Sequence, residues 1–119
     1  MISDLPLFQV YGAMARHAAE TQKVSATNIA RASEPGYKAV DVEPFTDFLA
    51  RTQLSEATGG NGTSVKKIES NNPAAPNGNT VSLEQEVMRS AEAVSQHDMA
   101  LTVYTKTLEL MRTAIGRRG

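Results

Sequence analysis

The fold is decided by the stretch from 81 to 115, which reads VSLEQEVMRSAEAVSQHDMALTVYTKTLELMRTAI and contains neither proline nor glycine. Apolar residues recur in this stretch at the heptad spacing that is typical of a coiled coil. One column consists of Val87, Val94, Leu101, Leu108 and Ile115, and the column beside it of Leu83, Ser90, His97, Tyr104 and Met111. The spacing therefore predicts one long helix with an a/d seam.

Both ends of this helix carry sequence signals. Ser82, followed three residues later by Gln85, is typical of a capping box at a helix start. Gly116 predicts the stop, because glycine readily takes the left-handed conformation that ends helices. Such a helix is roughly 50 Å long, which is too long to be buried within a domain of this size. The seam needs a partner, either in other chains or in this chain, and an intramolecular helical hairpin without any polymer fits the spacing equally well.

The segment from 5 to 32 is the second long helical candidate. One register of its apolar positions reads Phe8, Tyr11, Ala15, Ala18, Gln22, Ser25 and Ile29. The small and polar side chains in the middle of this register permit close approach but bury little apolar area. We therefore expect this helix to become ordered only against a partner.

The middle of the chain is predicted to be mostly irregular. Pro35 and Gly36 end the first helix, because the residue before a proline is disfavoured in the α region and glycine tolerates positive φ. Residues 37–42 should be extended, and residues 44–54 can form a short helix. From 55 to 79 the chain is rich in Gly, Asn, Ser, Thr and Pro, which indicates a flexible connection with a short extended piece. The chain thus divides into segments 1–33, 34–80 and 81–119 of one structural unit.

Composition argues against several classes of function. The net charge of −1 gives no electrostatic reason to expect nucleic acid or an anionic membrane surface as a partner. No apolar run approaches the roughly 20 residues that span a bilayer, and no secretory signal is visible. The two histidines, His17 and His97, do not stand in a metal-ligand spacing, and no cysteine is present. We expect no catalytic centre, cofactor or metal, and composition alone favours a cytoplasmic protein.

The stretch from 24 to 39 reads VSATNIARASEPGYKA and resembles the N-terminal signature of the flagellar axial proteins, which form rod and hook. In that family a helix ending in Asn-[Ile/Leu]-Ala-Asn-Ala leads into a Thr-Pro-Gly-Tyr or Thr-Thr-Gly-Tyr turn. The matching residues include Asn28, Ile29, Ala30, Pro35, Gly36 and Tyr37. Arg31 and Glu34 stand where the family usually has Asn and Thr.

A second resemblance lies before the long helix. Residues 78–86 read GNTVSLEQE and are similar to the Gly-Asn-x-Val-x-Leu-Glu-x-Glu segment that leads into the C-terminal helix of rod proteins. The family's usual Arg-Tyr pair in that helix is replaced here by Gln96 and His97. The short segment between the two terminal helices is typical of proximal rod subunits, whereas hook and distal rod members of the family carry large inserted domains.

This resemblance implies an all-α dominated fold, in which the two terminal helices form an antiparallel coiled-coil pair. It implies a structural, non-enzymatic subunit of the proximal rod of the basal body, which polymerises through its terminal helices to form a torque-transmitting shaft. The resemblance also implies export without a cleaved signal peptide. The implied partners are copies of the chain, other flagellar rod proteins, and base ring and export-gate components, without nucleic acid or membrane insertion. The predicted assembly interface consists of Phe8, Tyr11, Ala15, Ala18, Ile29, Val87, Val94, Leu101, Tyr104, Leu108, Met111 and Ile115. The alternatives are another rod subunit of the family or a cytoplasmic coiled-coil adaptor.

Overall fold

The structure, a computed structural model, describes residues 4–59 and 63–116. Its elements are α1 (Asp4–Ala30), β1 (Val40–Val42), α2 (Phe45–Ala57), β2 (Lys67–Glu69) and α3 (Leu83–Gly116). The molecule measures 67 × 29 × 16 Å and has a radius of gyration of 18.0 Å. A compact domain of this length would have a radius of gyration of roughly 13.5 Å. The predicted helix-dominated chain with two long terminal helices is therefore confirmed, in an extended shape.

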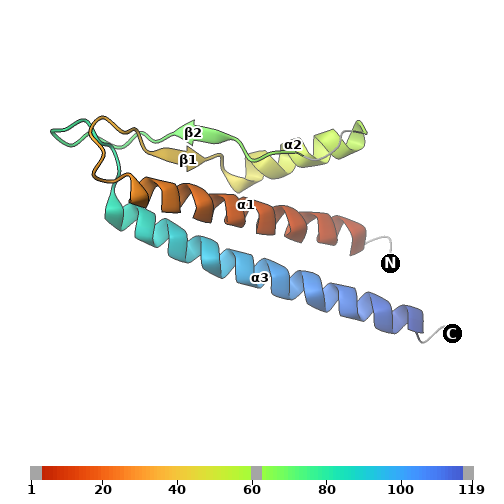
Figure 1. Cartoon of the computed structure of the whole chain (residues 1–119). Coiled ribbons are helices and arrows are strands. Elements are labelled where there is room, and N and C mark those ends of the chain that lie inside the picture. Colours follow the sequence, from red (N-terminus) through yellow and green to blue (C-terminus); the bar gives the residue numbers. More distant parts are fainter. Residues whose placement is uncertain (1–3, 60–62, 117–119) are drawn as a thin grey trace.

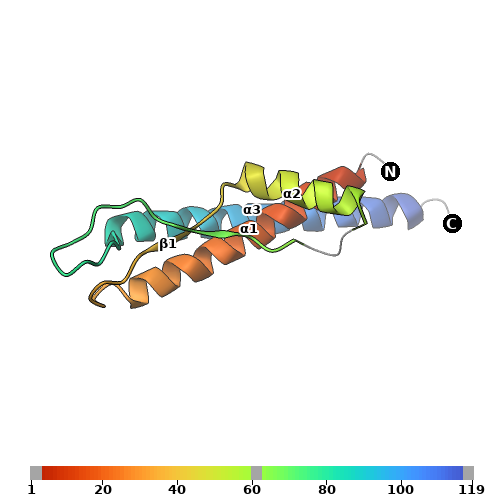
Figure 2. The same cartoon turned by 90° about the horizontal axis from the view of Figure 1, so that it is seen from above.

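The two long helices lie side by side and run in opposite directions (Figure 1). α1 is the middle layer, with α3 on one side and the strands and α2 on the other. The view from above shows the same elongated arrangement, with the start of α1 and the end of α3 at the same end of the molecule (Figure 2). α3, β1 and α2 each pack along α1, and β2 joins the fold by pairing with β1. This makes α1 the centre of the fold.

Small side chains fill the space between the two long helices. Ala13 and Ala18 of α1 and Ala93 and Ala100 of α3 are buried. Alanines at a helix contact allow the two axes to approach closely. The buried positions of α3 are Glu86, Ala93 and Ala100, spaced by seven and each one residue before a member of the apolar column that begins at Val87.

The middle segment is more ordered than its composition predicts. β1 and β2 pair antiparallel, with Asp41 opposite Ile68. The predicted short helix is confirmed as α2, which buries Phe48 and continues to Ala57. The predicted extended pieces are confirmed at the two strands, and residues 60–62 of the connection lie outside the described residues.

The two predicted glycine turns have different outcomes. Gly36 has a φ of 74°, which confirms the positive-φ turn after α1. The prediction for Gly116 is wrong: this residue is the last one of α3 and does not take a positive φ, which among the described glycines occurs at Gly36, Gly59 and Gly78. Among the described residues nothing lies within 4 Å of a Cβ built at Gly116, so no contact there forces the backbone out of the helical conformation. No helix among the described residues has an apolar stretch that could cross a bilayer.

Candidate functional site: a polar junction and an apolar stripe

The turn after α1 and the segment leading into α3 meet at one end of the molecule. We call this contact between residues 25–43 and 77–89 the junction. The backbone N–H of Gly36 donates to the carbonyl of Asn77 at 2.9 Å, and that of Thr80 donates to the carbonyl of Tyr37 at 3.1 Å. The amide of Asn79 donates to two carbonyls of the turn that follows α1, at positions 31 and 34, over 3.0 and 2.7 Å. The two sequence segments that resemble the axial proteins therefore form one structural unit.

Asn28 organises the α1 side of the junction. Its side chain is fully buried, and its Nδ2 donates to the carbonyl of Val40 at 2.7 Å. Its Oδ1 accepts from the backbone N–H of Val40 at 3.1 Å and from the hydroxyl of Tyr37 at 2.8 Å. One amide side chain thus holds both the start of β1 and the tyrosine of the turn against the last turns of α1.

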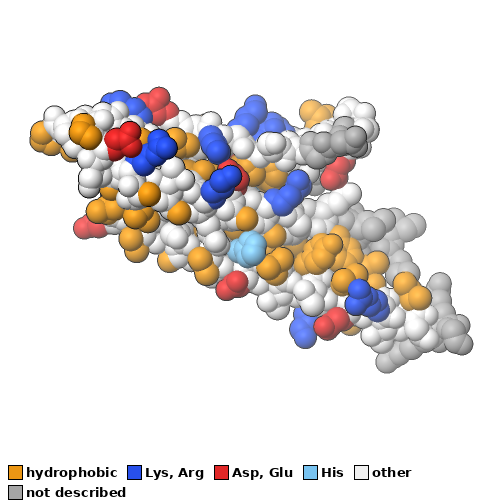
Figure 3. All heavy atoms as spheres, in the orientation of Figure 1, with side chains coloured by type: hydrophobic (Ala, Val, Ile, Leu, Met, Phe, Trp, Pro, Cys, Tyr) orange, Lys and Arg blue, Asp and Glu red, His pale blue; other side chains and the backbone are white. Residues whose placement is uncertain are grey.

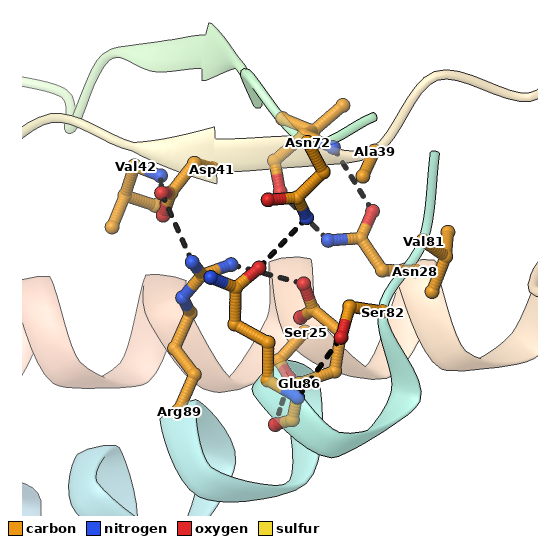
Figure 4. Close-up of polar contacts among 12 residues, drawn as sticks. Ser25, Asn28, Ala39, Asp41, Val42, Asn72, Val81, Ser82, Glu86 and Arg89 are labelled. Carbon is orange, nitrogen blue, oxygen red and sulfur yellow. Dashed lines mark hydrogen bonds and ion pairs between the residues drawn. The ribbon is translucent and has the colours of Figure 1, made fainter. Parts of the chain in front are cut away.

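Glu86 and Arg89 organise the α3 side (Figure 4). The carboxylate of Glu86 is fully buried and accepts from Arg89 Nη1 at 2.9 Å through Oε1, whereas Oε2 has no hydrogen-bond partner among the described residues. The second Nη of Arg89 lies 3.3 Å from Asp41 Oδ2 on β1. The hydroxyl of Ser25 donates to the backbone carbonyl of Glu86 at 2.8 Å. These contacts tie α3 to both α1 and β1.

A second polar cluster, centred on Glu43, holds the middle segment. Its carboxylate binds the guanidinium of Arg51 on α2 and accepts from the backbone N–H of Lys66 at 2.6 Å. Burial by itself would raise the pKa of Glu43, but the hydrogen bonds from Arg51 and Lys66, which favour the charged form, together lower this pKa below its usual value of 4.5. The Nε2 of His17 lies 2.7 Å from the backbone carbonyl of Glu43, to which it donates.

Two of the polar side chains that could carry chemistry make structural contacts. His17 and Ser25 each donate to a backbone carbonyl. Within residues 4–59 and 63–116, no three His, Asp or Glu side chains come together as metal ligands. The chain also presents a candidate interaction surface.

That surface is the apolar column on α3, which we call the outer stripe: Val87, Val94, Leu101, Leu108 and Ile115. Val87, Val94, Leu101 and Ile115 are 60%, 46%, 44% and 57% exposed, and Leu108 is half-buried. The face in Figure 3 shows hydrophobic side chains at intervals along α3, gathering toward its C-terminal half. The side chains that the heptad repeat would place in a coiled-coil seam are therefore left uncovered in the single chain.

The chain is 28% identical to the flagellar basal body rod protein FlgB of Agrobacterium fabrum, over 98% of this chain and 97% of that protein. The likeness runs from end to end. No established family profile matches the chain.

The other residues of the predicted assembly interface lie in three kinds of surroundings. Ala18 is buried, and Ile29 and Tyr104 are exposed, whereas Phe8, Tyr11, Ala15 and Met111 are half-buried. Phe8 and Tyr104 meet edge to face, with ring centroids 4.8 Å apart, near the end opposite the junction. The structure contains one copy of the chain, so the role of these residues in assembly stays a prediction.

The family-like residues are gathered at the junction. Asn28 and Tyr37 bond to each other, Gly36 makes the turn, and Ala30 and Pro35 are exposed beside it. Sequence reasoning missed the partners that complete the junction: Ser25, Asp41, Glu86 and Arg89. The signal available in the sequence was the position of Glu86, which stands seven residues before Ala93 and so lies in the same column of the helix. In the structure this column faces α1.

Proposed function

We propose that this chain is a structural subunit of the proximal rod in a bacterial flagellar basal body, and that it polymerises through α1 and α3. The end-to-end similarity to a rod protein supports the class of function. The junction supports it independently, because it joins the two segments that resemble axial proteins into one hydrogen-bonded unit. The proposal includes no enzymatic activity and no cofactor.

The observation that carries the proposal is the exposed outer stripe. From Val87 to Ile115 it extends for roughly 42 Å along the helix. Soluble monomers rarely leave such a continuous apolar feature uncovered, and an exposed apolar patch typically marks an interaction surface. The heptad spacing favours a helical partner, since side chains that recur every seven residues stay on one side of the helix, as one column of a coiled-coil seam does. We therefore propose that the stripe packs in coiled-coil fashion on helices of neighbouring subunits.

Such contacts suit a rod. A surface that binds a different surface on the next copy, without closing into a ring, generates a helical filament. In this arrangement the antiparallel α1 and α3 of each subunit lie along the shaft, and knobs-into-holes packing resists bending and twisting. The resulting stiffness is what a shaft that transmits torque requires. The proposed partners are further copies of the chain, other rod proteins, and base ring and export-gate components.

The core agrees with export of an unfolded chain and folding on assembly. Among the described residues, Phe48 is the one large apolar side chain that is fully buried, and alanines make much of the remaining core. Burial of apolar area contributes about 25 cal/mol per Å², so alanine contacts stabilise the free subunit only weakly. A chain of this kind gains its full helical order when neighbours cover the stripe. We propose export without a cleaved signal peptide on the same grounds and on the resemblance.

The test is a pair of substitutions on α3. Leu101→Asp places a charge in the middle of the stripe, whereas Thr102→Asp places the same charge on the neighbouring exposed position. Both side chains are exposed in the free subunit, so both variants should have the wild-type circular dichroism spectrum. In cells that lack the wild-type chain, Leu101→Asp should abolish rod assembly and motility, because a carboxylate in a dry seam has no partner. Thr102→Asp should preserve both.

Two results would contradict the proposal. Normal motility with Leu101→Asp would exclude the outer stripe as the assembly surface. Recovery of the wild-type chain in the cytosol, with none in purified basal bodies, would instead favour the cytoplasmic adaptor. An adaptor should also be strongly helical and melt cooperatively when dilute, whereas a rod subunit should gain helix on assembly.

A further inference from the structure

The charged residues of α3 have opposite signs at equal distances on either side of Met99. An acidic residue stands seven positions before Met99, and a basic residue stands seven positions after it. At ten positions the residue before is basic and the residue after is acidic. At thirteen positions the residue before is again acidic and the residue after is basic. The pairs are Glu92 with Lys106, Arg89 with Glu109, and Glu86 with Arg112. Asp98 is the one charged residue between 86 and 112 that has no opposite. An antiparallel pair of identical helices centred on Met99 would bring each charge opposite its complement.

Part of this pattern forms a continuous face of the helix. Met88, Glu92, Met99, Lys106 and Leu110 are separated by four, seven, seven and four residues, which places them on one side of an α-helix. We call these five residues the mirror face. All five are exposed, and its three apolar members, Met88, Met99 and Leu110, are among the most exposed large hydrophobic residues of the chain. The mirror face is distinct from the outer stripe and shares no residue with it.

We propose that the free subunit forms a two-fold symmetric dimer in which the mirror faces of two copies pack antiparallel. Met99 lies against Met99 of the second copy. Glu92 of each copy pairs with Lys106 of the other, and Met88 packs against Leu110 of the other. Because a two-fold contact uses the same surface on both copies, it closes on itself and does not propagate. The dimer therefore belongs to the unassembled pool and goes beyond the role proposed for the rod.

The surroundings of Met88 fit this arrangement. Met88 and Glu92 line an open depression of about 460 Å³, together with Ser82, Glu84, Gln85 and Arg89. In the antiparallel pair, Leu110 of the second copy lies over this depression. Of the three charge pairs, that of Glu92 and Lys106 is available at the surface, since Glu86 is buried and Arg89 is bound to Asp41. Lys106 also lies 3.7 Å from Glu109, but an exposed pair within one helix contributes little.

The size of the mirror face sets the strength of the contact. From Met88 to Leu110 it is roughly 33 Å long and about 10 Å wide, so it covers on the order of 330 Å² per copy. Stable complexes bury about 800 Å² per partner. The dimer should accordingly be weak and should appear only in concentrated solution.

The first test exchanges charges and measures dimerisation of the full chain by sedimentation between about 10 µM and 1 mM, the range in which a weak dimer becomes populated. Glu92→Lys and Lys106→Glu should each weaken the dimer about tenfold, because each replaces two attractive pairs by two repulsive ones. The double variant should dimerise like the wild type, and an equimolar mixture of the two single variants should form heterodimers. A wild-type chain that remains monomeric throughout, or single variants that dimerise normally, would overturn the proposal.

The second test determines the orientation. The chain has no cysteine, so single thiols can be introduced without interference. A mixture of Met88→Cys and Leu110→Cys should form a mixed disulfide on mild oxidation, while each variant alone should remain largely uncrosslinked. Ala91→Cys, on another side of the helix, is the matched control. Efficient crosslinking of Met88→Cys to itself would indicate parallel helices and contradict the antiparallel arrangement.

The two proposals can fail separately. A monomeric wild-type chain that still builds rods removes the dimer and leaves the rod function. A chain that dimerises as described but is absent from basal bodies supports the dimer and removes the rod function.

Discussion

Replacing Asn28 by alanine should destabilise the isolated chain by about 3 kcal/mol. Asn28 is fully buried and takes part in three hydrogen bonds, two with the backbone of Val40 and one with the hydroxyl of Tyr37. A hydrogen bond contributes about 1 kcal/mol net, and a partner left unpaired in a buried place adds to the loss. Since small domains have a total stability of only about 5–15 kcal/mol, the loss should be large.

The assay is urea unfolding followed by far-ultraviolet circular dichroism. Asn71→Ala, which removes the same side chain from an exposed position in the loop, is the matched control and should change the free energy of unfolding by less than about 0.5 kcal/mol. Tyr37→Phe removes only one of the three bonds and should cost about 1 kcal/mol.

The double variant distinguishes a local network from a general loss of packing. Once Asn28 is alanine, the hydroxyl of Tyr37 has already lost its partner, so adding Tyr37→Phe should cost nothing further. The coupling energy of the two positions should therefore be about 1 kcal/mol. Fully additive effects, or a loss below about 1 kcal/mol for Asn28→Ala, would refute the view that this amide organises the junction.

Three further predictions concern the middle segment and the glycines. The pKa of Glu43 is lower in the folded state than its usual 4.5, so the stability that this group contributes is present above that pH and is lost as the pH falls through the folded pKa. The midpoint of urea unfolding should therefore decline as the pH is lowered across this range. Glu43→Gln should make this decline smaller. Gly78→Ala should destabilise the chain by roughly 1–3 kcal/mol, since the φ of Gly78 is 86° and a Cβ there would lie 3.3 Å from the Cα of Gly36. Gly12→Ala, where nothing lies within 4 Å of the new Cβ, should stabilise it by about 0.5–1 kcal/mol, and a lower thermal midpoint for this variant would contradict the assignment.

The helices and turns could be predicted because their signals are local. The Oγ of Ser82 accepts from the backbone N–H of Gln85 at 3.4 Å, as a helix cap requires. The other half of the expected capping box is absent, because the side chain of Gln85 instead accepts from Asn72 at 2.7 Å. Asn72 lies in the connection that was predicted to be flexible, so a tertiary contact replaced the local one.

Which side of α3 packs against α1 could not be predicted in the same way. The heptad pattern of α3 identifies apolar columns, but the side turned toward α1 carries Glu86, Ala93 and Ala100. The alanines occupy this side of α3 because their small side chains let the two helices approach. The buried carboxylate of Glu86 is stabilised there by its ion pair with Arg89. Hydrophobicity alone ranks these residues below valine and leucine, and so it assigns them to the surface.

The sequence by itself determined where this chain is helical and where it turns, because caps, heptads and the conformational freedom of Gly36 act over only a few residues. The tertiary structure alone decided which face of α3 is covered and which is left open as the outer stripe. That decision depends on contacts between distant positions, such as the bond from Ser25 to Glu86 across 61 residues of sequence. Burial is a property of two surfaces that meet, and a single helical pattern specifies only one of them.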